Sequence, residues 1–378
     1  MKARYMFFLL ILICSVFSSR SARACSTFSF MSPEGLIMGK SYDFGFGHGM
    51  LVTNKRNVHK MGLVTDKKLI RYSAEWTSKY GSITFNQFGR ELPSGGINEK
   101  GLVIEQMWLV GGKYPLPNQK PTVNELQWMQ YQLDNYATVQ EVIENASKIQ
   151  IAKTAAELHY LLCDATQKCG IIDFVDGRML TYSKETLPLP AITNSPYLAS
   201  LAEFEKYKGK EYKAIQNPDD SMQRFSKIAY LIRNLEPQTI KNPYQYAFHI
   251  LDEVSFKPNM IHKIKHYFGS PLPASYWNTV YNTKKKEFRF RTYEIPTIRE
   301  VSINAFDFSC KTPVKVLHLD EKLEGNVNAK FKNYSKEDNK KIVDLSYGNW
   351  SDVLPPEGQK FLIEYPDKLI CEVSNEKK

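Results

Sequence analysis

Cys25 is the residue with the greatest potential for covalent chemistry, because of what precedes it. Lys2 and Arg4 give the start of the chain a positive charge, and residues 6–17 form an apolar run too short to span a bilayer. Ala-Arg-Ala at residues 22–24 then matches the A-x-A pattern of a signal-peptide cleavage site. We therefore predict that residues 1–24 are a signal peptide. Its removal leaves Cys25 at the N-terminus of a periplasmic or secreted protein with no stable membrane anchor.

An N-terminal cysteine carries both a nucleophile and a base. Only the thiolate form of cysteine is nucleophilic, so the thiol needs a proton acceptor or a lowered pKa. A free α-amino group has a pKa of about 7.7–8.0 and can take that proton near neutral pH. The carboxylate of Asp43 can orient the amine, and the charge of Lys40 favours the thiolate. This set of groups predicts attack on an amide carbonyl, with hydrogen-bond donors for the oxyanion.

A hairpin is expected to bring these groups together. It consists of strands at residues 26–30 and 36–43 and a turn at residues 31–35. The expected register pairs Phe30 with Leu36 and Phe28 with Met38. The same register places Cys25 opposite Ser41, with Asp43 as the diagonal neighbour at about 7–8 Å between Cα atoms. Lys40 then faces the other side of the sheet unless a bulge turns it.

Other readings of Cys25 stay open. A cysteine directly after a signal can also be a lipoprotein cysteine, although Arg23 fits poorly among the small residues that such a site needs. A lipidated chain would be a binding or structural module without catalysis. A histidine base is the rival mechanism, but no cysteine has papain-like flanking residues. His159 and His249 lie among apolar residues and are interpreted as core or cleft residues.

Charge and composition exclude several classes of function. Four of the ten net positive charges lie in the first 24 residues, which contain no acidic residue, and Lys284–Lys286 fits a hairpin turn. No nucleic-acid motif, phosphate-binding loop or metal-binding motif is present. We expect no nucleic-acid partner, no metal and no cofactor. Of the five cysteines after residue 24, Cys163 and Cys169 suit a hairpin disulfide, and Cys310 and Cys371 can form a second pair.

The expected elements follow a grouped order of strands, two helices, strands, two helices and strands. The helices are expected at residues 122–135, 138–149, 221–235 and 243–255, with a capping box at Thr138 and Glu141 and with Ser221 and Pro243 at the start of the second pair. Strands are expected near residues 51–58, 81–85, 101–110, 157–163, 170–175, 178–183, 276–282, 287–293 and 299–304. This grouping favours an α+β fold of antiparallel sheets with helices layered on them. We predict one domain over residues 25–378, with a catalytic core at about 25–305 and a lysine-rich tail at 306–378 carrying strands near 313–318 and 360–364.

Several motifs in order resemble the choloylglycine hydrolase family, which includes the penicillin V acylases and bile salt hydrolases. The motifs are Cys25-Ser-Thr, Gly39-Lys-Ser-Tyr-Asp43, Gly96-Ile-Asn-Glu-Lys-Gly-Leu102, Leu158-His159 with Asp164, Ile192-Thr-Asn-Ser-Pro196, Arg224-Phe225 and the hairpin from Trp277 to Tyr293. The likeness covers roughly residues 25–305. It implies the four-layer αββα sandwich of the N-terminal nucleophile hydrolase superfamily.

The resemblance also implies residue roles. Cys25 corresponds to the nucleophile and base, and Asp43 to the aspartate that binds its amine. Asn194 corresponds to the asparagine of the oxyanion hole, and Trp108 to the position whose backbone N–H completes that hole. Arg224 corresponds to the arginine that supports the cysteine network. Lys40 departs from the family arginine and keeps its charge without the planar fork.

The resemblance implies a linear N-acyl amide as the small-molecule substrate. Phe44, Phe46 and Trp108 are expected to form an apolar wall for the acyl group. Trp108 is similar to the Gram-negative acylase branch, so we favour penicillin V or acyl-homoserine lactones over conjugated bile salts. Only 29 residues separate Asn194 from Arg224, fewer than in tetrameric bile salt hydrolases. We therefore expect a dimer or monomer rather than a tetramer.

Overall fold

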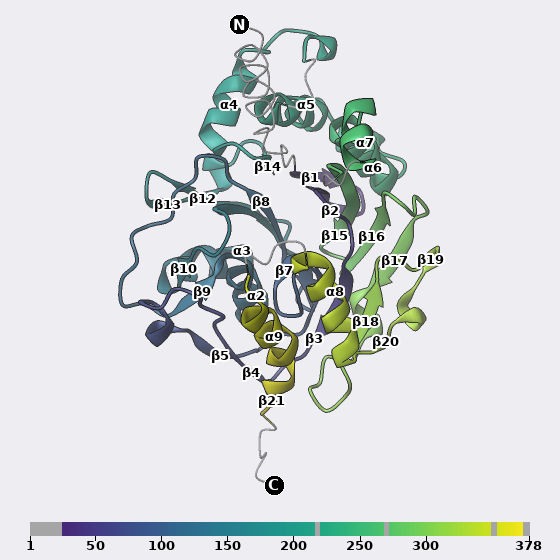
Figure 1. The fold of residues 1–378 in the computed structure, drawn as a ribbon. Helices are drawn as coiled ribbons and strands as arrows, with labels where there is room; N and C mark the ends of the chain where they lie inside the picture. The colour runs from purple at the N-terminus through teal and green to yellow at the C-terminus, as the bar shows by residue number, and fades with distance from the viewer. Residues whose placement is uncertain (1–24, 216–219, 268–271, 349–353, 373–378) are drawn as a thin grey trace, which may run out of the picture.

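The computed structural model describes residues 25–215, 220–267, 272–348 and 354–372 (Figure 1). The predicted signal peptide at residues 1–24 lies outside these ranges. Two large sheets face each other, which agrees with the predicted grouping of strands and helices.

The first sheet has seven strands and contains the N-terminal segment next to one of its edge strands. Its spatial order is β14 (Ala191–Ile192), β1 (Ser26–Ser32), β2 (Gly35–Phe44), β15 (Ala274–Asn282), β16 (Glu287–Thr292), β17 (Arg299–Ser302) and β19 (Gly325–Asn326). All neighbouring strands are antiparallel except β17 and β19. The strand that begins directly after Cys25 is therefore paired on both sides.

The second sheet has nine strands. Its order is β13 (Arg178–Ser183), β12 (Cys169–Val175), β11 (Leu158–Cys163), β8 (Val103–Trp108), β7 (Pro93–Asn98), β6 (Ser82–Asn86), β3 (Met50–Asn54), β18 (Lys315–His318) and β20 (Lys332–Asn333). Two small sheets lie outside it, one of β9 (Thr122–Asn124) with β10 (Gln150–Ala152), and one of β21 (Ile370–Cys371), β4 (Val58–Met61) and β5 (Glu75–Thr77).

Helices cover the outer face of each sheet. The helices are α2 (Glu125–Asn135), α3 (Val139–Asn145), α4 (Tyr197–Glu205), α5 (Ser221–Arg233), α6 (Pro243–Val254), α7 (Met260–Tyr267), α8 (Lys336–Tyr347) and α9 (Pro356–Glu364). Helices α2 and α3 pack on the nine-stranded sheet, whereas α5 and α6 pack on β1, β2 and β15.

Aromatic pairs mark each boundary between layers. Trp128 of α2 stacks on Tyr160 of β11 with ring centroids 4.3 Å apart. Phe85 of β6 contacts Phe288 of β16 across the two sheets at 5.6 Å. Phe30 of β1 meets Tyr246 of α6 edge-on at 5.5 Å. These contacts confirm the predicted four-layer αββα sandwich.

The predicted register of the first hairpin is wrong by one residue. Strand β1 continues to Ser32 and the turn has only two residues, so Ser32 pairs with Gly35 and Ser26, rather than Cys25, pairs with Ser41. Lys40 is consequently opposite Thr27. Because residues alternate between the two faces of a strand, this shift places Lys40 on the face that Thr27 and Cys25 share, without a bulge.

The predicted helix starts are mostly correct. Thr138 forms the expected capping box with Glu141, and Pro243 occupies the first turn of α6. Helix α5 begins at Ser221 as predicted and is capped by Asp220, whose side chain accepts from the N–H of Gln223. Helices α4 and α7 were not expected.

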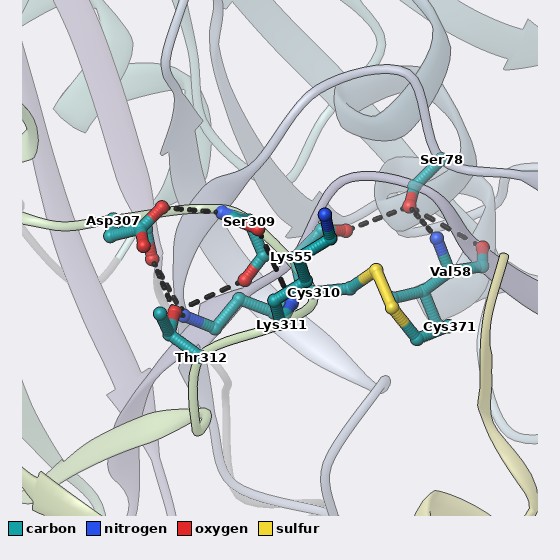
Figure 2. The surroundings of a disulfide bond; sticks show 9 residues. All are labelled: Lys55, Val58, Ser78, Asp307, Ser309, Cys310, Lys311, Thr312 and Cys371. Carbon is teal, nitrogen blue, oxygen red and sulfur yellow. Dashed lines mark hydrogen bonds between the residues drawn. A yellow bond between two sulfur atoms is a disulfide. The ribbon is translucent and has the colours of Figure 1, made fainter. Parts of the chain in front are cut away.

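The lysine-rich tail is more helical than predicted. The strand expected near residues 313–318 is β18, but residues 360–364 belong to α9 and not to a strand. Helix α8 was also not expected. Two disulfides fix this part of the chain and the hairpin β11–β12: Cys310 pairs with Cys371 (Figure 2), and Cys163 with Cys169. Within the described ranges the remaining cysteine is Cys25.

Candidate active site

Cys25 is buried against the backbone of Asp43. Its side chain and backbone together are only 6% exposed. The Sγ atom lies 3.4 Å from the backbone N of Asp43, which donates to it, and 3.5 Å from the backbone O of Asp43. The hairpin β1–β2 therefore holds the thiol directly beside the carboxylate residue that the sequence singled out.

The two carboxylate oxygens of Asp43 have different surroundings. Oδ1 accepts from Ser275 Oγ at 2.6 Å and from Ser41 Oγ. Oδ2 is buried and accepts no hydrogen bond within the described part of the chain. Burial raises the pKa of Asp43 to about 6, although the hydroxyls of Ser275 and Ser41 act in the opposite direction. An unpaired buried carboxylate oxygen is costly and favours a donor that would approach it.

Two cations act on the thiol. Burial raises the pKa of Cys25, while the charges of Lys40 and then Arg224 lower it. Both side chains are 1% exposed, so water screens their fields weakly. The site thus disfavours a bare thiolate through desolvation and favours it through charge.

Lys40 reaches from β2 across to the nine-stranded sheet. Its Nζ donates to the backbone O of Gln106, lies 3.1 Å from Met107 Sδ and lies 3.9 Å from Glu105 Oε2. Burial raises the pKa of Glu105 to about 7, with Lys40 lowering it. The lysine therefore ties the two sheets together at the candidate site and keeps a positive charge there.

Asn194 connects Arg224 with the end of β8. Its Nδ2 donates to the backbone O of Trp108 at 2.9 Å, and its Oδ1 accepts from Arg224 Nη2 at 2.8 Å. The backbone N–H of Asn194 donates to Ser221 Oγ at 2.9 Å. The structure thus brings Asn194, Trp108 and Arg224 into one cluster, and Arg224 also acts electrostatically on Cys25 and Asp43.

His159 supports the segment that carries Asn194. Its Nε2 lies 2.7 Å from the backbone O of Thr193, and its Nδ1 lies 3.2 Å from Asp173 Oδ1. The interpretation as a core or cleft residue is correct for the buried His159 and wrong for His249, which is exposed on α6. The pairing of His159 with Asp173 was not predicted. The hairpin disulfide contained the signal, because pairing Cys163 with Cys169 sets a register that places Asp173 opposite His159.

Aromatic side chains follow Asp43. Phe44 is buried and meets the half-buried Phe46 edge-on, with centroids 4.8 Å apart. Phe88 packs against Phe44 at 5.7 Å. The structure gathers two of the three expected wall residues, whereas Trp108 stands at the end of β8 with Asn194.

A cavity of about 580 Å³ lies elsewhere, at the other end of β1 from Cys25. Met31, Cys169, Leu189 and Leu235 are among its lining residues, and Cys25 is not. In the described ranges no group of three or more His, Cys, Asp or Glu side chains is placed to hold a metal ion, and no helix there has the length and apolarity to cross a bilayer.

Comparison with known proteins identifies the class first. The solved penicillin V acylase of Agrobacterium tumefaciens superposes with a TM-score of 0.69 at 23% identity, covering 82% of this chain and 98% of that one. A variant of the conjugated bile acid hydrolase of Clostridium perfringens superposes with a TM-score of 0.66 at 18% identity, covering 79% and 98%. This chain therefore has the fold of these two solved hydrolases.

The sequence comparisons go further. The penicillin V acylase of Pectobacterium atrosepticum is 26% identical over 276 residues, which are 63% of this chain and 70% of that protein. The family model of the linear amide C–N hydrolases, choloylglycine hydrolase family, matches residues 25–316. The chain belongs to this family and is a linear amide carbon–nitrogen hydrolase.

Proposed function

We propose that the mature protein hydrolyses an N-acyl amide of the penicillin V or acyl-homoserine lactone type through an acyl-thioester on Cys25. The observation that carries this proposal is the contact of Cys25 Sγ with Asp43, whose Oδ2 accepts no hydrogen bond from the residues that the structure describes. Cleavage after residue 24 would convert the nitrogen of Cys25 into an amine, and Asp43 Oδ2 would accept from it.

The first half-reaction transfers the acyl group. The α-amine takes the thiol proton, and Sγ attacks the carbonyl carbon of the substrate. When the tetrahedral intermediate collapses, the C–N bond breaks and the α-ammonium returns its proton to the leaving nitrogen. In the second half-reaction the amine takes a proton from water, and the resulting hydroxide equivalent attacks the carbonyl carbon of the thioester. The C–S bond then breaks, the carboxylic acid is released, and the α-ammonium returns its proton to the Cys25 thiolate.

The other residues act through charge and hydrogen bonding. The positive charges of Lys40 and Arg224 favour the thiolate. Asn194 Nδ2 carries two hydrogens, one of which is used by the carbonyl of Trp108. We assign the second hydrogen, with the backbone N–H of Trp108, to the oxyanion. Phe44, Phe46 and Trp108 would contact the acyl group.

Two lines of support concern the substrate and the compartment. Both named acylase relatives are penicillin V acylases, which favours this substrate type over a bile salt. The two disulfides are typical of proteins in an oxidising compartment, and the periplasm and the extracellular medium are such compartments. They therefore support the proposal that the protein is exported. Light scattering of the mature protein is expected to give the mass of a monomer or dimer.

The test is intact-mass spectrometry of the exported protein after brief incubation with penicillin V, a set of acyl-homoserine lactones and glycocholate. We expect a mature mass that begins at Cys25 and an acyl adduct on that residue with the first two. A diacylglyceryl mass on Cys25 would instead support the lipoprotein alternative, and an adduct on another residue would refute the mechanism.

A further inference from the structure

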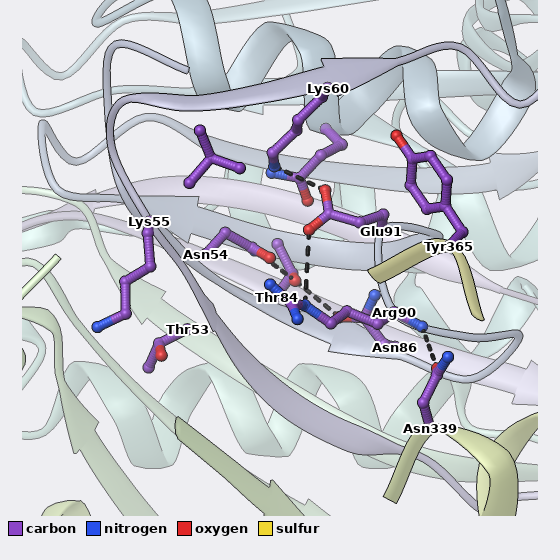
Figure 3. Close-up of polar contacts among 12 residues, drawn as sticks. Thr53, Asn54, Lys55, Lys60, Thr84, Asn86, Arg90, Glu91, Asn339 and Tyr365 are labelled. Atoms are coloured by element: carbon purple, nitrogen blue, oxygen red, sulfur yellow. Dashed lines mark hydrogen bonds and ion pairs between the residues drawn. The ribbon is translucent and has the colours of Figure 1, made fainter. Parts of the chain in front are cut away.

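Residues 317–378 lie outside the segment that the family model matches. Their described part contains β19, β20, α8, α9 and β21, drawn in light green and yellow in Figure 1. This C-terminal segment is tied down at several points. The Cys310–Cys371 disulfide holds its end (Figure 2), and Tyr365 Oη donates to the backbone O of Met61 at 2.7 Å. Asn339 of α8 accepts from the backbone N–H of Arg90 at 2.7 Å (Figure 3).

The last turn of α8 contacts the loop that follows β2. His48 Nε2 lies 2.8 Å from Ser346 Oγ, and Ser346 Oγ donates to the backbone O of Gln87 at 2.6 Å. A hydroxyl has one hydrogen, so Ser346 must accept from His48, which therefore carries its proton on Nε2. Burial lowers the pKa of His48 to about 4, followed by the charge of Lys341, so the ring is neutral at physiological pH.

The same contact reaches the aromatic residues that follow Asp43 in the chain. The His48 ring is parallel to Phe46, with centroids 4.7 Å apart. Gln87 accepts from Tyr42 Oη at 2.6 Å and donates to the backbone O of Phe46 at 2.8 Å. One residue after Ser346, the ring of Tyr347 packs on Phe88 at 5.9 Å.

The loop is held from its other side as well. A Cβ at Gly47 would lie 2.0 Å from the Tyr276 ring, so the backbone passes directly against that ring. The loop at residues 45–49 is thus enclosed between Tyr276 and α8. Its conformation, and with it the position of Phe46, depends on a helix outside the family match.

We propose that α8 determines specificity, with Ser346 positioning His48 and Phe46 so that the wall beyond Asp43 accepts an aromatic acyl group. This inference rests on the proposed function, because it assigns the acyl side of the substrate to that wall. Ser346 is a positioning residue and takes no part in the chemistry at Cys25. Loss of its hydroxyl frees His48 and the carbonyl of Gln87 and releases the loop.

The experiment compares the labelling of Cys25 by two reagents. The chloromethyl ketone of phenoxyacetic acid presents an aromatic acyl group, whereas iodoacetamide is small and reports thiol reactivity alone. We divide the rate constant for labelling by the chloromethyl ketone by the rate constant for labelling by iodoacetamide. Ser346→Ala is expected to lower this ratio about tenfold, because one or two buried hydrogen bonds are lost. The iodoacetamide rate should stay within about twofold of wild type, and thermal unfolding should show that the variant is folded.

Two further variants sharpen the result. His48→Ala removes the same contact from the other side, so the loss in the double variant should be smaller than the sum of the losses in the two single variants. Lys340→Ala is the matched control, since Lys340 is exposed on α8 and pairs with Asp344 away from the loop. It should leave the ratio unchanged.

Each other outcome has a defined meaning. An unchanged ratio in folded Ser346→Ala protein would overturn the specificity role, and an equal fall in both rates would place its effect on the thiol instead. Aromatic selectivity in labelling without amide turnover would overturn the proposed function alone. Absence of any labelling at Cys25 would overturn both.

Discussion

At the scale of single residues, the thiol of Cys25 has no substitute within the site. The other four described cysteines are paired in disulfides. We predict that Cys25→Ala abolishes turnover and adduct formation while the circular dichroism spectrum stays that of the wild type. Full activity in this variant would contradict the mechanism.

The raised pKa of Asp43 predicts a pH dependence that changes on processing. In a chain that keeps a residue before Cys25, the pKa of Asp43 is about 6, above its usual value. The folded state then binds the proton more tightly than the unfolded state, so this stabilising contribution is complete below about pH 4 and is lost as the pH rises through about 6.

Asp43→Asn should remove that dependence. The quantity to compare is the free energy of unfolding of the unprocessed variant minus that of the unprocessed wild type. This difference should be about 2–3 kcal/mol more positive at pH 7 than at pH 4, because only the wild type loses stability over that range. In the mature protein the α-ammonium stabilises the carboxylate, so this gain should vanish and turnover should fall by about 100-fold or more. Denaturant titrations at the two pH values and kcat/KM check these statements.

Lys40 contributes charge to the thiol, so its removal should be visible without substrate. We predict that Lys40→Met raises the apparent pKa of Cys25, because a nearby positive charge that favours the thiolate is lost. The pH profile of iodoacetamide labelling measures this shift. Lys100→Met, a surface substitution, is the control. An unshifted pH profile for Lys40→Met would show that the charge of Lys40 does not act on the thiol.

At the scale of elements, the burial of strand β2 explains why the register of the first hairpin could not be predicted from the pattern of polar and apolar residues. All ten residues of β2 are buried, so no polar face distinguishes one register from the next. The error was one residue, and it changed the predicted face of Lys40. Helix α9 was mistaken for a strand because Phe361, Leu362 and Ile363 form a short apolar run, which both kinds of element can contain.

The disulfide that anchors the C-terminal segment closes a long loop. Cys310 and Cys371 are 61 residues apart, whereas Cys163 and Cys169 are 6 apart. Since loop-closure entropy grows with loop length, Cys371→Ser should lower the free energy of unfolding by about 2–4 kcal/mol, and Cys169→Ser by less. Equilibrium unfolding of both variants, each paired with its partner serine substitution, tests the order.

At the scale of the whole molecule, the grouped order of helices and strands was sufficient to predict antiparallel sheets with helices layered on them, and the family resemblance implied the four-layer sandwich. The site was predictable as far as motifs carried it, namely Cys25, Asp43, Asn194 and Arg224. Contacts between distant segments were not, because nothing local marks them. Ser275 on Asp43 and Ser346 on His48 are examples, separated by 232 and 298 residues.

A buried ion cluster on the far side of the nine-stranded sheet is another long-range feature. Lys60 Nζ lies 2.6 Å from Glu91 Oε2 and 3.0 Å from Asp134 Oδ2, and none of the three side chains is more than 1% exposed (Figure 3 draws the first pair). Lys60→Met would leave the buried carboxylate of Asp134 without its cation, while Glu91 would keep Arg90, whose Nε lies 3.7 Å from Glu91 Oε1. It should lower the free energy of unfolding by about 3–5 kcal/mol, whereas Lys340→Met should have little effect.

The nitrogen of Cys25 is an ordinary peptide nitrogen for as long as Ala24 is attached to it, and the lone pair of such a nitrogen is delocalised into the neighbouring carbonyl and does not take up a proton near neutral pH. Newly made chains inside the cell would therefore not hydrolyse the amides around them. The signal peptidase would act as the activating enzyme, so that export and activation would occur in the same step.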